Sequence, residues 1–520
     1  MDSLLSVVTY LPALASLILL IFLRGRDDAA NRNARVLAFV ASMATFVISI
    51  AIFTEFEPAD TGFQLVEEYA WPLGLTYKVG VDGVSLFLVL LTTLMMPIAV
   101  CASWSVKTRV KEYMILFLMM ETFALAAFTA LDLMVFFVAL EAGLVSLFLL
   151  IGIWGGKGSI LAGTKAFLYS LPGSLLLAAT FAAAFAEAGT TDIPLLLAYP
   201  FSAEPATFAG ISLPDGTQTL LFVAFLLAFA LKMPIWPFHP WATTASAQAP
   251  AGVSLIHTAV FIKIGAYGLI RFNVDMLPVA ADALASAMIV LGLICVIYTA
   301  VVALAAEDVK RLIGTLAVGQ MGLILIGVFT FTQQGMEGAL MQLLSHGLVF
   351  GALFSCAAIL YERAGVRDLD AYGGLIARMP IFGFVFLIFA LASFGLPGTS
   401  AFVGYLLPLI GLAGKSVLLA AVLALGLVPG AYAMLWAYRR IMLGELIKNS
   451  LKAAPDLNWR EAFMVAPLLL LVLLFGFAPG LVLDVIAPSA EAFLESHQTA
   501  IDGVGTLILE GQSQTTADEN

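Results

Sequence analysis

Charged side chains are scarce in this sequence. Asp, Glu, Lys and Arg make up 11% of the 520 residues, whereas 62% of the residues are hydrophobic. A soluble domain carries about 25% charged residues, so this composition excludes an ordinary soluble protein. Apolar runs of roughly 18 or more residues, the length that a membrane-spanning helix needs, recur along the whole chain. The chain is therefore predicted to be an all-α polytopic membrane protein.

Cysteines and clustered basic residues are also few. The three cysteines, Cys101, Cys295 and Cys356, lie in apolar segments without metal or disulfide spacing. Without a basic footprint, we expect no nucleic-acid partner. The net charge of −11 arises largely from a loop at 187–217 without Lys or Arg and from an acidic tail. The first apolar segment lacks a basic leading region and a cleavage site, so it is predicted to be a retained helix.

The apolar segments predict about fourteen transmembrane helices. They cover residues 3–24, 34–54, 83–105, 112–129, 132–153, 164–186, 218–238, 250–270, 278–304, 312–331, 336–361, 379–411, 416–438 and 462–484. With the N-terminus outside, only Lys78, Arg271 and Lys415 of the 24 basic residues fall in outer loops, and Lys232 and Lys263 lie within the membrane. Inner loops carry the excess of Lys and Arg in membrane proteins, so both termini are predicted to lie outside.

Two apolar runs are interrupted by proline and glycine. One run reads "LKMPIWPFHPW" at 231–241, and the other reads "ASFGLPGTSAFVGYLL" at 392–407. They lie five predicted helices apart, an odd number that gives two copies opposite orientations. Broken helices at corresponding positions are typical of transporters built from two inverted repeats, here of five helices each. The alternative is a pair of ordinary proline kinks.

Three ionisable residues lie deep within apolar runs: Glu141, Lys232 and Lys263. Such residues usually mark an ion or proton pathway, because a buried charge is unfavourable in a membrane. Burial favours the neutral form of each side chain, whereas an opposite charge within a few ångströms favours the charged form. A pair of Glu141 and Lys232 would therefore hold a proton while the two groups are close and release it when they separate. Lys263, on the next helix, would continue the relay.

Other polar residues accompany these three. They are His239, His257 and His346 within the membrane, Glu121 and Asp132 nearer helix ends, and Asp308 and Lys310 at the start of a helix at the inner surface. An imidazole titrates near neutral pH, so a histidine could extend the relay. Each histidine could equally be a core residue hydrogen-bonded to the backbone. We interpret Arg271, Arg439 and Arg440 as anchors at the membrane interface.

Several stretches have a specific pattern. They read "EAGLVSLFLLIGIWGGK", "LKMPIWPFHPW", "AQAP", "IKIGAYGLIRF", "SHGLVFGALF" and "YGGLIARMPIFGFVFLIFALASFGLPGTSAFVG". These motifs resemble those of the antiporter-like membrane subunits of respiratory complex I, of the NuoM type and with an alphaproteobacterial character. The resemblance covers essentially the whole chain. Subunits of Mrp-type sodium/proton antiporters and of membrane-bound hydrogenases are more distant relatives.

The resemblance implies a proton-translocating subunit of NADH:quinone oxidoreductase in a bacterial inner membrane. The chain would be part of an enzyme without holding its redox site, because flavin, iron–sulfur clusters and quinone are expected in partner subunits. It would hold no metal. Its partners would be NuoL-type and NuoN-type neighbours in a hetero-oligomer, together with lipids. The implied divisions are 1–110 for three N-terminal helices, 111–271 and 272–445 for the two repeats, and 446–520 for the last helix and the acidic tail.

Five residues match functional positions of the family. Glu141 matches the glutamate of helix five, Lys232 the lysine of the broken helix, and Lys263 the central lysine of helix eight. His239 and His346 match histidines near the polar axis. The resemblance thus assigns these side chains to proton transfer.

The chain also departs from the family pattern. The family usually has a glutamate, the exit acid, where this chain has Tyr405, and tyrosine carries no negative charge at neutral pH. The family motif "PDAH" is replaced by the segment 243–246, which contains Thr244 and Ser246, and a usual histidine is replaced by Gln320. Thr244, Ser246 and Gln320 are secondary relay candidates, because such side chains can pass a proton together with water.

Three functions remain open from the sequence. In the first, protons enter from the inner side near Lys232, pass His346 and Lys263, and leave around Tyr405. In the second, the chain is a divergent structural paralogue that kept the fold but does not pump. The third is a subunit of an Mrp-type cation/proton antiporter.

Overall fold

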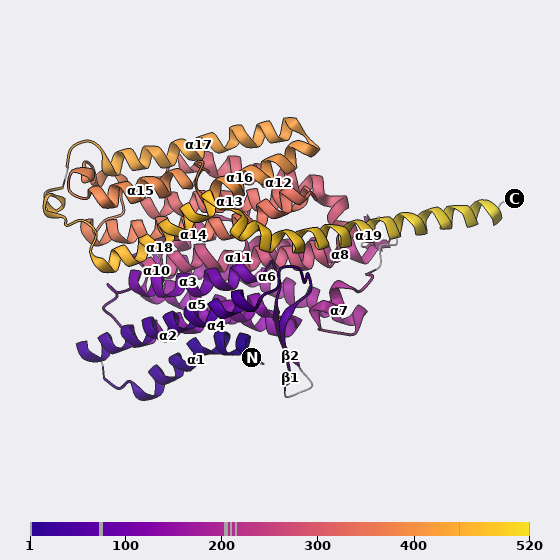
Figure 1. The fold of residues 1–520 in the computed structure, drawn as a ribbon, viewed down its shortest axis with the longest axis horizontal. Helices are drawn as coiled ribbons and strands as arrows, with labels where there is room; N and C mark the ends of the chain where they lie inside the picture. The colour runs from indigo at the N-terminus through magenta and orange to yellow at the C-terminus, as the bar shows by residue number, and fades with distance from the viewer. Residues whose placement is uncertain are drawn as a thin grey trace.

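The computed structural model describes residues 3–25, 27–71, 76–201, 206–208, 211–213, 216–446 and 448–518. Figure 1 shows a bundle of helices with roughly parallel axes. The chain passes from the indigo helices at one side to the orange helices at the other, and its yellow C-terminal segment then lies across the middle of the bundle. Within the described residues, 11 helices are long and apolar enough to cross a membrane. They are α1 (Leu4–Phe22), α2 (Asp28–Glu55), α4 (Val110–Thr129), α5 (Leu133–Trp154), α6 (Ser159–Ala188), the continuous run α10 to η3 (Ala251–Asp275), α12 (Pro278–Ala303), α13 (Val309–Phe329), α14 (Gln333–Ala364), α17 (Val417–Met442) and α18 (Trp459–Phe477).

Four apolar helices are shorter. They are α3 (Leu86–Ala102), α8 (Gly216–Lys232), α15 (Pro380–Ala392) and α16 (Ser400–Lys415). Both interruptions that the sequence predicted are present. The chain leaves α8 at Lys232 and enters the short helix α9 at Pro240–Gln248, and it leaves α15 at Ala392 and enters α16 at Ser400.

The two ends of the bundle differ. One end carries the loops between α1 and α2 and between α17 and α18, and we call it the basic end because Arg24, Lys107, Lys310 and Arg363 lie there. The opposite end carries an antiparallel hairpin of β1 (Gln64–Ala70) and β2 (Thr76–Val81), and we call it the hairpin end. The short helix α7 (Ile193–Leu197) belongs to the same end. The strands β3 (Ala206–Phe208) and β4 (Ile211–Leu213) form a second antiparallel pair.

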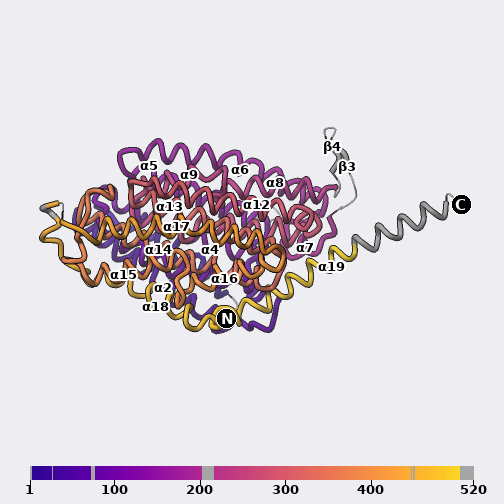
Figure 2. The backbone as a smooth tube through the Cα atoms, turned by 90° about the horizontal axis from the view of Figure 1, so that it is seen from above, coloured from indigo at the N-terminus to yellow at the C-terminus, as the bar shows by residue number. Residues whose placement is uncertain are grey.

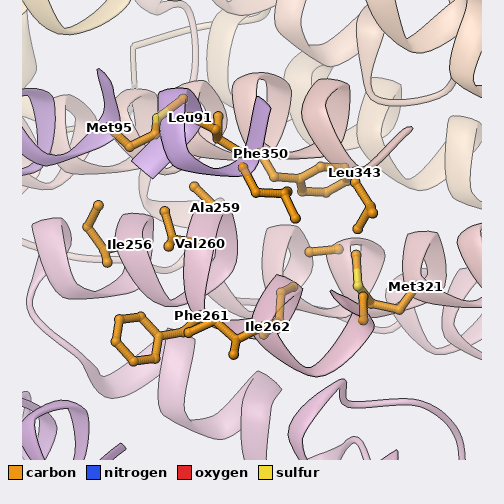
Figure 3. Packing of buried hydrophobic residues seen from close by; sticks show 14 of the residues in the cluster. Leu91, Met95, Ile256, Ala259, Val260, Phe261, Ile262, Met321, Leu343 and Phe350 are labelled. Carbon is orange, nitrogen blue, oxygen red and sulfur yellow. The ribbon is translucent and has the colours of Figure 1, made fainter. Parts of the chain in front are cut away.

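Three spans form the interior of the bundle. In α10 to η3, α13 and α14, the whole apolar window is buried, whereas only 28% of the window is buried in α17 and α18. Figure 3 shows Leu91, Met95, Val260, Met321 and Phe350 among the apolar side chains around this interior. Polar residues on the three interior helices therefore lie far from lipid, where a buried polar group needs a partner.

Two predictions fail at element boundaries. The segment 462–484 is two helices, because α18 ends at Phe477 and α19 begins at Gly480. Ala478 has φ −128° and ψ 64°, outside the helical region, as expected for a residue before a proline. The helix α19 extends over Gly480–Asp518, where the sequence predicted only a tail after the last span, and it packs against α12, α14 and α18.

Arg271 is not an interface anchor, and that interpretation was wrong. The residue is 4% exposed, and its guanidinium donates to Asp82 and, at 3.2 Å from Nη1 to Oδ2, to Asp275. The ring of Phe63 lies 5.1 Å from the guanidinium carbon. Asp82 and Phe63 are distant in sequence, so periodicity could not predict a buried charged cluster that fixes the hairpin to η3 (Leu269–Asp275).

Candidate functional site

Glu141 and Lys232 form a buried pair in the first half of the chain. Nζ of Lys232 lies 2.7 Å from Oε1 of Glu141, and Lys232 is 3% exposed. Ser174 of α6 joins them: its hydroxyl donates to Oε2 of Glu141 at 2.6 Å and accepts from Lys232 at 3.0 Å. The three side chains close a triangle in which each group has two partners. Each ionisable group of the pair thus has an oppositely charged group and a hydroxyl at hydrogen-bond distance.

The break after α8 positions Lys232. Lys232 is the last residue of α8, so its ammonium projects from a helix terminus beside the break. The carbonyl of Leu231, which no continuing helix would satisfy, accepts a hydrogen bond from Nε1 of Trp241 at 2.9 Å. A Cβ at Gly265 would lie 2.4 Å from the backbone nitrogen of Met233. Only glycine therefore lets α11 (Ile262–Gly268), which carries Lys263, pass so close to the break.

Lys263 and His346 form a second pair at the centre of the bundle. Nζ of Lys263 lies 2.6 Å from Nδ1 of His346 and donates to the carbonyl of Thr258 at 2.8 Å. Lys263 is 0% exposed. Residues His257–Phe261 form the π-helical turn η2, which widens the backbone, and such turns often occur at functional sites. The backbone carbonyl of Thr258, five residues before Lys263, thus accepts a hydrogen bond from the lysine side chain.

The hydrogen bonds define the state of His346. Its Nδ1 lies 2.6 Å from Nζ of Lys263, and this contact can hold a proton on either nitrogen. Its Nε2 lies 3.1 Å from the carbonyl of Ala317 on α13, and a carbonyl can only accept, so Nε2 carries the proton. Nδ1 of His346 and Nζ of Lys263 can therefore exchange a proton while Nε2 stays bonded to the carbonyl. Exchange of the proton between the two nitrogens needs only a short displacement.

Ser246 and His257 lie between the two halves of the chain. Oγ of Ser246, on α9, lies 3.0 Å from Nδ1 of His257 and 3.5 Å from Oγ1 of Thr258. Nε2 of His257 is buried and has no hydrogen-bond partner within the described residues. His257 is therefore only half satisfied, and it is not the fully bonded core histidine that the sequence left open.

Tyr405 and Gln320 lie toward the hairpin end. Nε2 of Gln342, one turn before His346 on α14, donates to Oε1 of Gln320 at 3.1 Å. The hydroxyl of Tyr405 donates to the carbonyl of Ser393 at 2.6 Å, at the break before α16. Gln320, Ser393 and Tyr405 line the same small cavity of about 20 Å³. A polar path thus continues from His346 past two glutamines to a tyrosine.

The other predicted residues lie elsewhere. Oε2 of Glu121 accepts a hydrogen bond from Ser42 of α2 at 2.8 Å, away from Glu141. Asp132 caps the start of α5, because its carboxylate accepts from the backbone of Met134 at 2.8 Å. Thr244 and His239 do not contact the lysines either: Thr244 bonds back to the carbonyl of Pro240, and His239 packs on Tyr298 with ring centroids 5.4 Å apart.

Sequence reasoning missed Ser174, Gln342 and the backbone acceptors. Ser174 lies in the apolar run of α6, and nothing in its neighbourhood distinguishes it from other serines. The spacing of Gln342 from His346 could have been noticed, because residues four apart share a helix face. Among the residues that the structure describes, no group of three or more His, Cys, Asp or Glu side chains could hold a metal ion.

Comparison with known proteins is consistent with this geometry. Residues 130–429 match the family model described as NADH:quinone oxidoreductase/Mrp antiporter, transmembrane. The chain is 44% identical over 508 residues to NADH-quinone oxidoreductase subunit M of Rhodobacter capsulatus, covering 98% of this chain and 99% of the relative. It is 37% identical over 504 residues to NADH-ubiquinone oxidoreductase chain 4 of Marchantia polymorpha, covering 96% of each chain.

Solved structures agree. A chain of respiratory complex I from Thermus thermophilus with bound NADH superposes with a TM-score of 0.84 at 29% identity, covering 95% of this chain and 99% of that one. A chain of the Mrp complex from Dietzia sp. superposes with a TM-score of 0.81 at 20% identity, covering 96% and 99%, and shows a shared fold. The chain therefore belongs to the NADH:quinone oxidoreductase and Mrp antiporter family of transmembrane subunits, and it is similar to M subunits of that family.

Proposed function

We propose that this chain is a proton-translocating membrane-arm subunit of an NADH:quinone oxidoreductase. The observation that carries the proposal is the presence of two buried lysines, each held by a partner able to exchange a proton. Lys232 faces Glu141 at 2.7 Å, and Lys263 faces His346 at 2.6 Å. Such groups are unfavourable in a membrane interior and are retained where they transfer protons.

The mechanism follows from the pair geometry. With Glu141 at hydrogen-bond distance, Lys232 holds its proton. When an electrostatic change in a neighbouring subunit draws Glu141 away, the buried ammonium loses its counter-charge and the proton moves on. Charges in the membrane are poorly screened, so one subunit can influence the next. The proton passes to Lys263 and His346 and leaves past Gln342, Gln320 and Tyr405. The free energy comes from redox chemistry in partner subunits, which carry the flavin, iron–sulfur clusters and quinone.

The orientation and architecture belong to the same proposal. The basic end faces the inner side, following the positive-inside rule, and both termini lie outside. Taking α8 with α9 and α15 with α16 as single broken spans, and adding α3 to the long helices, gives the fourteen crossings expected for two inverted five-helix repeats. NuoL-type and NuoN-type subunits are the neighbours that we propose.

One observation favours a second candidate, a structural subunit that does not pump. The exit position holds Tyr405, and its hydroxyl donates to a backbone carbonyl instead of offering an ionised group. Against this candidate, Glu141, Lys232 and Lys263 are all present, and their burial is unfavourable if they are idle.

The experiment compares Lys232→Ala with Lys452→Ala in the parent complex. Lys452 is exposed at the basic end, in η6 (Asn449–Ala453). Purified complexes are reconstituted in sealed liposomes, and the protons moved per electron pair are measured. Lys232→Ala is expected to lose this subunit's share of the protons, whereas Lys452→Ala keeps the wild-type ratio. An unchanged ratio in Lys232→Ala would contradict the proposed path.

A further inference from the structure

A cavity opens at the basic end of the bundle. Its volume is about 250 Å³, room for several water molecules at about 30 Å³ each. The loop before α4, the end of α5, the start of α10 (Ala251–Ile256) and one face of α14 form its walls. Lys107, Lys310 and Arg367 are the charged residues that line it. Lys232 is not among the residues of this cavity.

Lys310 lies at the inner part of the cavity. The residue is 5% exposed, and Nζ donates to the carbonyl of Ala249 at 2.6 Å. Within the described part of the chain, no carboxylate lies within ion-pair distance of this ammonium. The nearby Asp308 uses its carboxylate to cap α13, accepting from the backbone of Arg311 at 2.9 Å. A buried amine in contact with a water-sized space, and without a fixed counter-charge, is suited to binding and releasing protons.

A line of polar groups leads from this cavity to Lys263. Ser254 donates to the carbonyl of Ser246 at 2.8 Å, next to Ala249. A Cβ at Gly314, one turn beyond Lys310 on α13, would lie 3.3 Å from Cβ of Ser246, so α9 and α13 approach closely. Ser246 contacts His257, and the carbonyl of Thr258 contacts Lys263. Nε2 of His257 is buried and has no hydrogen-bond partner among the described residues.

We propose that the cavity and Lys310 form a second proton-uptake site, which supplies Lys263 through Ser246 and His257 in addition to the route past Lys232. A water molecule protonates the neutral amine of Lys310, forming an N–H bond and leaving hydroxide in the aqueous phase. Lys310 then passes a proton to the hydroxyl of Ser246, which gives its own proton to Nδ1 of His257. His257 releases the proton of Nε2 to a neutral Lys263. The imidazole changes tautomer, and no oxidant or reductant is needed.

Charged groups around Lys310 affect this step in both directions. Arg367 and Lys107 on the cavity wall disfavour a second positive charge, and Asp308 at the start of α13 favours it. Arg367 is itself engaged, since its guanidinium donates to the carbonyl of Ala247 and lies 5.4 Å from the ring centroid of Tyr361. The positive charges of Arg367 and Lys107 therefore weaken the binding of a proton to Lys310.

The proposal rests on the proposed function, and its test separates the two. Lys310→Met, Lys310→Arg and Arg311→Met are compared with Lys263→Met in reconstituted complexes, and both electron transfer and protons per electron pair are measured. Arg311 is the exposed next residue of α13 and serves as the matched control. Arginine keeps the charge and can keep the bond to Ala249, but it does not release its proton. Lys310→Met and Lys310→Arg are expected to lose part of the proton share that Lys263→Met loses, while Arg311→Met loses none.

Each contrary outcome has a distinct meaning. A wild-type ratio in Lys310→Arg would overturn the proposal and show that Lys310 only caps α9. A wild-type ratio in an assembled Lys310→Met complex would overturn it as well, and if that variant fails to assemble, Lys310→Arg decides. If Lys263→Met also keeps the ratio, the proposed function fails. If Lys263→Met loses its share and the Lys310 variants do not, only the uptake site is wrong.

Discussion

Lys263 and His346 lie 2.6 Å apart, nitrogen to nitrogen, at a point where both residues are 1% exposed or less. Lys263 lies on α11, which follows η2 directly, and His346 lies on α14. The apolar parts of both helical runs are completely buried. No carboxylate accompanies them within the described residues. Nζ of Lys263 therefore has an imidazole nitrogen and a backbone carbonyl as its partners, and a proton can pass between the two nitrogen atoms without a carboxylate.

Removing the imidazole tests this relationship. His346→Leu leaves Lys263 with the carbonyl of Thr258 as its remaining acceptor, so we expect this subunit's share of proton transport to be lost. The control is Phe350→Leu, which changes the ring that stacks on His346 at 4.6 Å but removes no polar group. Both are measured as protons per electron pair in liposomes. Equal ratios in the two variants would contradict the role of His346.

Ser174 completes the triangle around the first pair, and Ser174→Ala removes two hydrogen bonds to charged groups. Bonds of this kind contribute about 1.5–3 kcal/mol each, so we expect a less stable Glu141–Lys232 pair and fewer protons moved per electron pair. Ser146→Ala is the control, because its hydroxyl donates only to the carbonyl of Ala142 at 3.1 Å. A proton-to-electron ratio that is the same for both variants would count against the triangle.

Gly265 is required where α11 passes the break. Gly265→Ala places a Cβ against the backbone at Lys232 and Met233, which cannot move as a flexible side chain can. Overpacking of this kind costs about 1–3 kcal/mol, so we expect a lower melting temperature of the complex and reduced proton transport. Gly152→Ala on α5 is the control, since its Cβ would meet nothing within 4 Å. Equal melting temperatures would show that the approach is looser than the structure indicates.

Tyr405 decides between a pump and a spacer. If the tyrosine hydroxyl serves as the outlet, Tyr405→Phe loses this subunit's share of protons because the donor to Ser393 is removed, and Tyr405→Glu keeps the wild-type ratio. The measurement is again the proton-to-electron ratio. A ratio that rises above wild type in Tyr405→Glu, while Tyr405→Phe changes nothing, would identify the natural chain as a subunit that has lost its outlet.

The helix α19 contains a pH-sensitive contact at the hairpin end. His497 stacks on Phe331 with ring centroids 3.9 Å apart, and burial lowers the pKa of this imidazole to about 4, while Asp282 raises it and Lys415 lowers it. The unfolded value is near 6.5, so the docked helix binds fewer protons than the free one. The docking of α19 on the bundle is therefore most stable above about pH 6.5, and it becomes less stable as the pH falls toward 4.

Hydrogen exchange of the α19 amides, corrected for intrinsic rates, measures this effect. Exchange is expected to be faster at pH 5 than at pH 7 in the natural chain, and His497→Leu is expected to remove the difference. Gln498→Leu, which changes the exposed neighbouring residue, should keep it. A pH effect that persists in His497→Leu would assign it to another group.

The sequence was informative where local chemistry decides the structure. The apolar runs predicted the spans, and the prolines and glycines predicted both breaks, because proline removes a donor and glycine permits left-handed backbone such as φ +81° at Gly395. The pairing of Glu141 with Lys232 was also predicted, since two opposite charges in an apolar interior are far more stable together. Pro479 is a local signal for the boundary between α18 and α19, which the predicted single segment 462–484 did not reflect.

The rest depended on contacts between distant residues. Nothing near Ser174 in the sequence indicates that it lies between Glu141 and Lys232, and nothing near Arg271 indicates Asp82, which is 189 residues away. Asp132 was predicted as a relay candidate because an aspartate can either cap a helix or transfer protons, and its position in the sequence does not distinguish the two roles. Glu121 on α4 faces Ser42 of α2 and not Glu141, and nothing near Glu121 in the sequence indicates this orientation. Such facts follow from tertiary packing.

The most direct test of the central claim is the proton-to-electron ratio of the reconstituted parent complex carrying Lys263→Met, measured beside the exposed control Lys452→Met. The account predicts that electron transfer continues with an uncoupler present, that Lys263→Met moves fewer protons per electron pair by one subunit's share, and that the control matches wild type. A wild-type ratio in Lys263→Met, in a fully assembled complex, would contradict the claim that this chain moves protons.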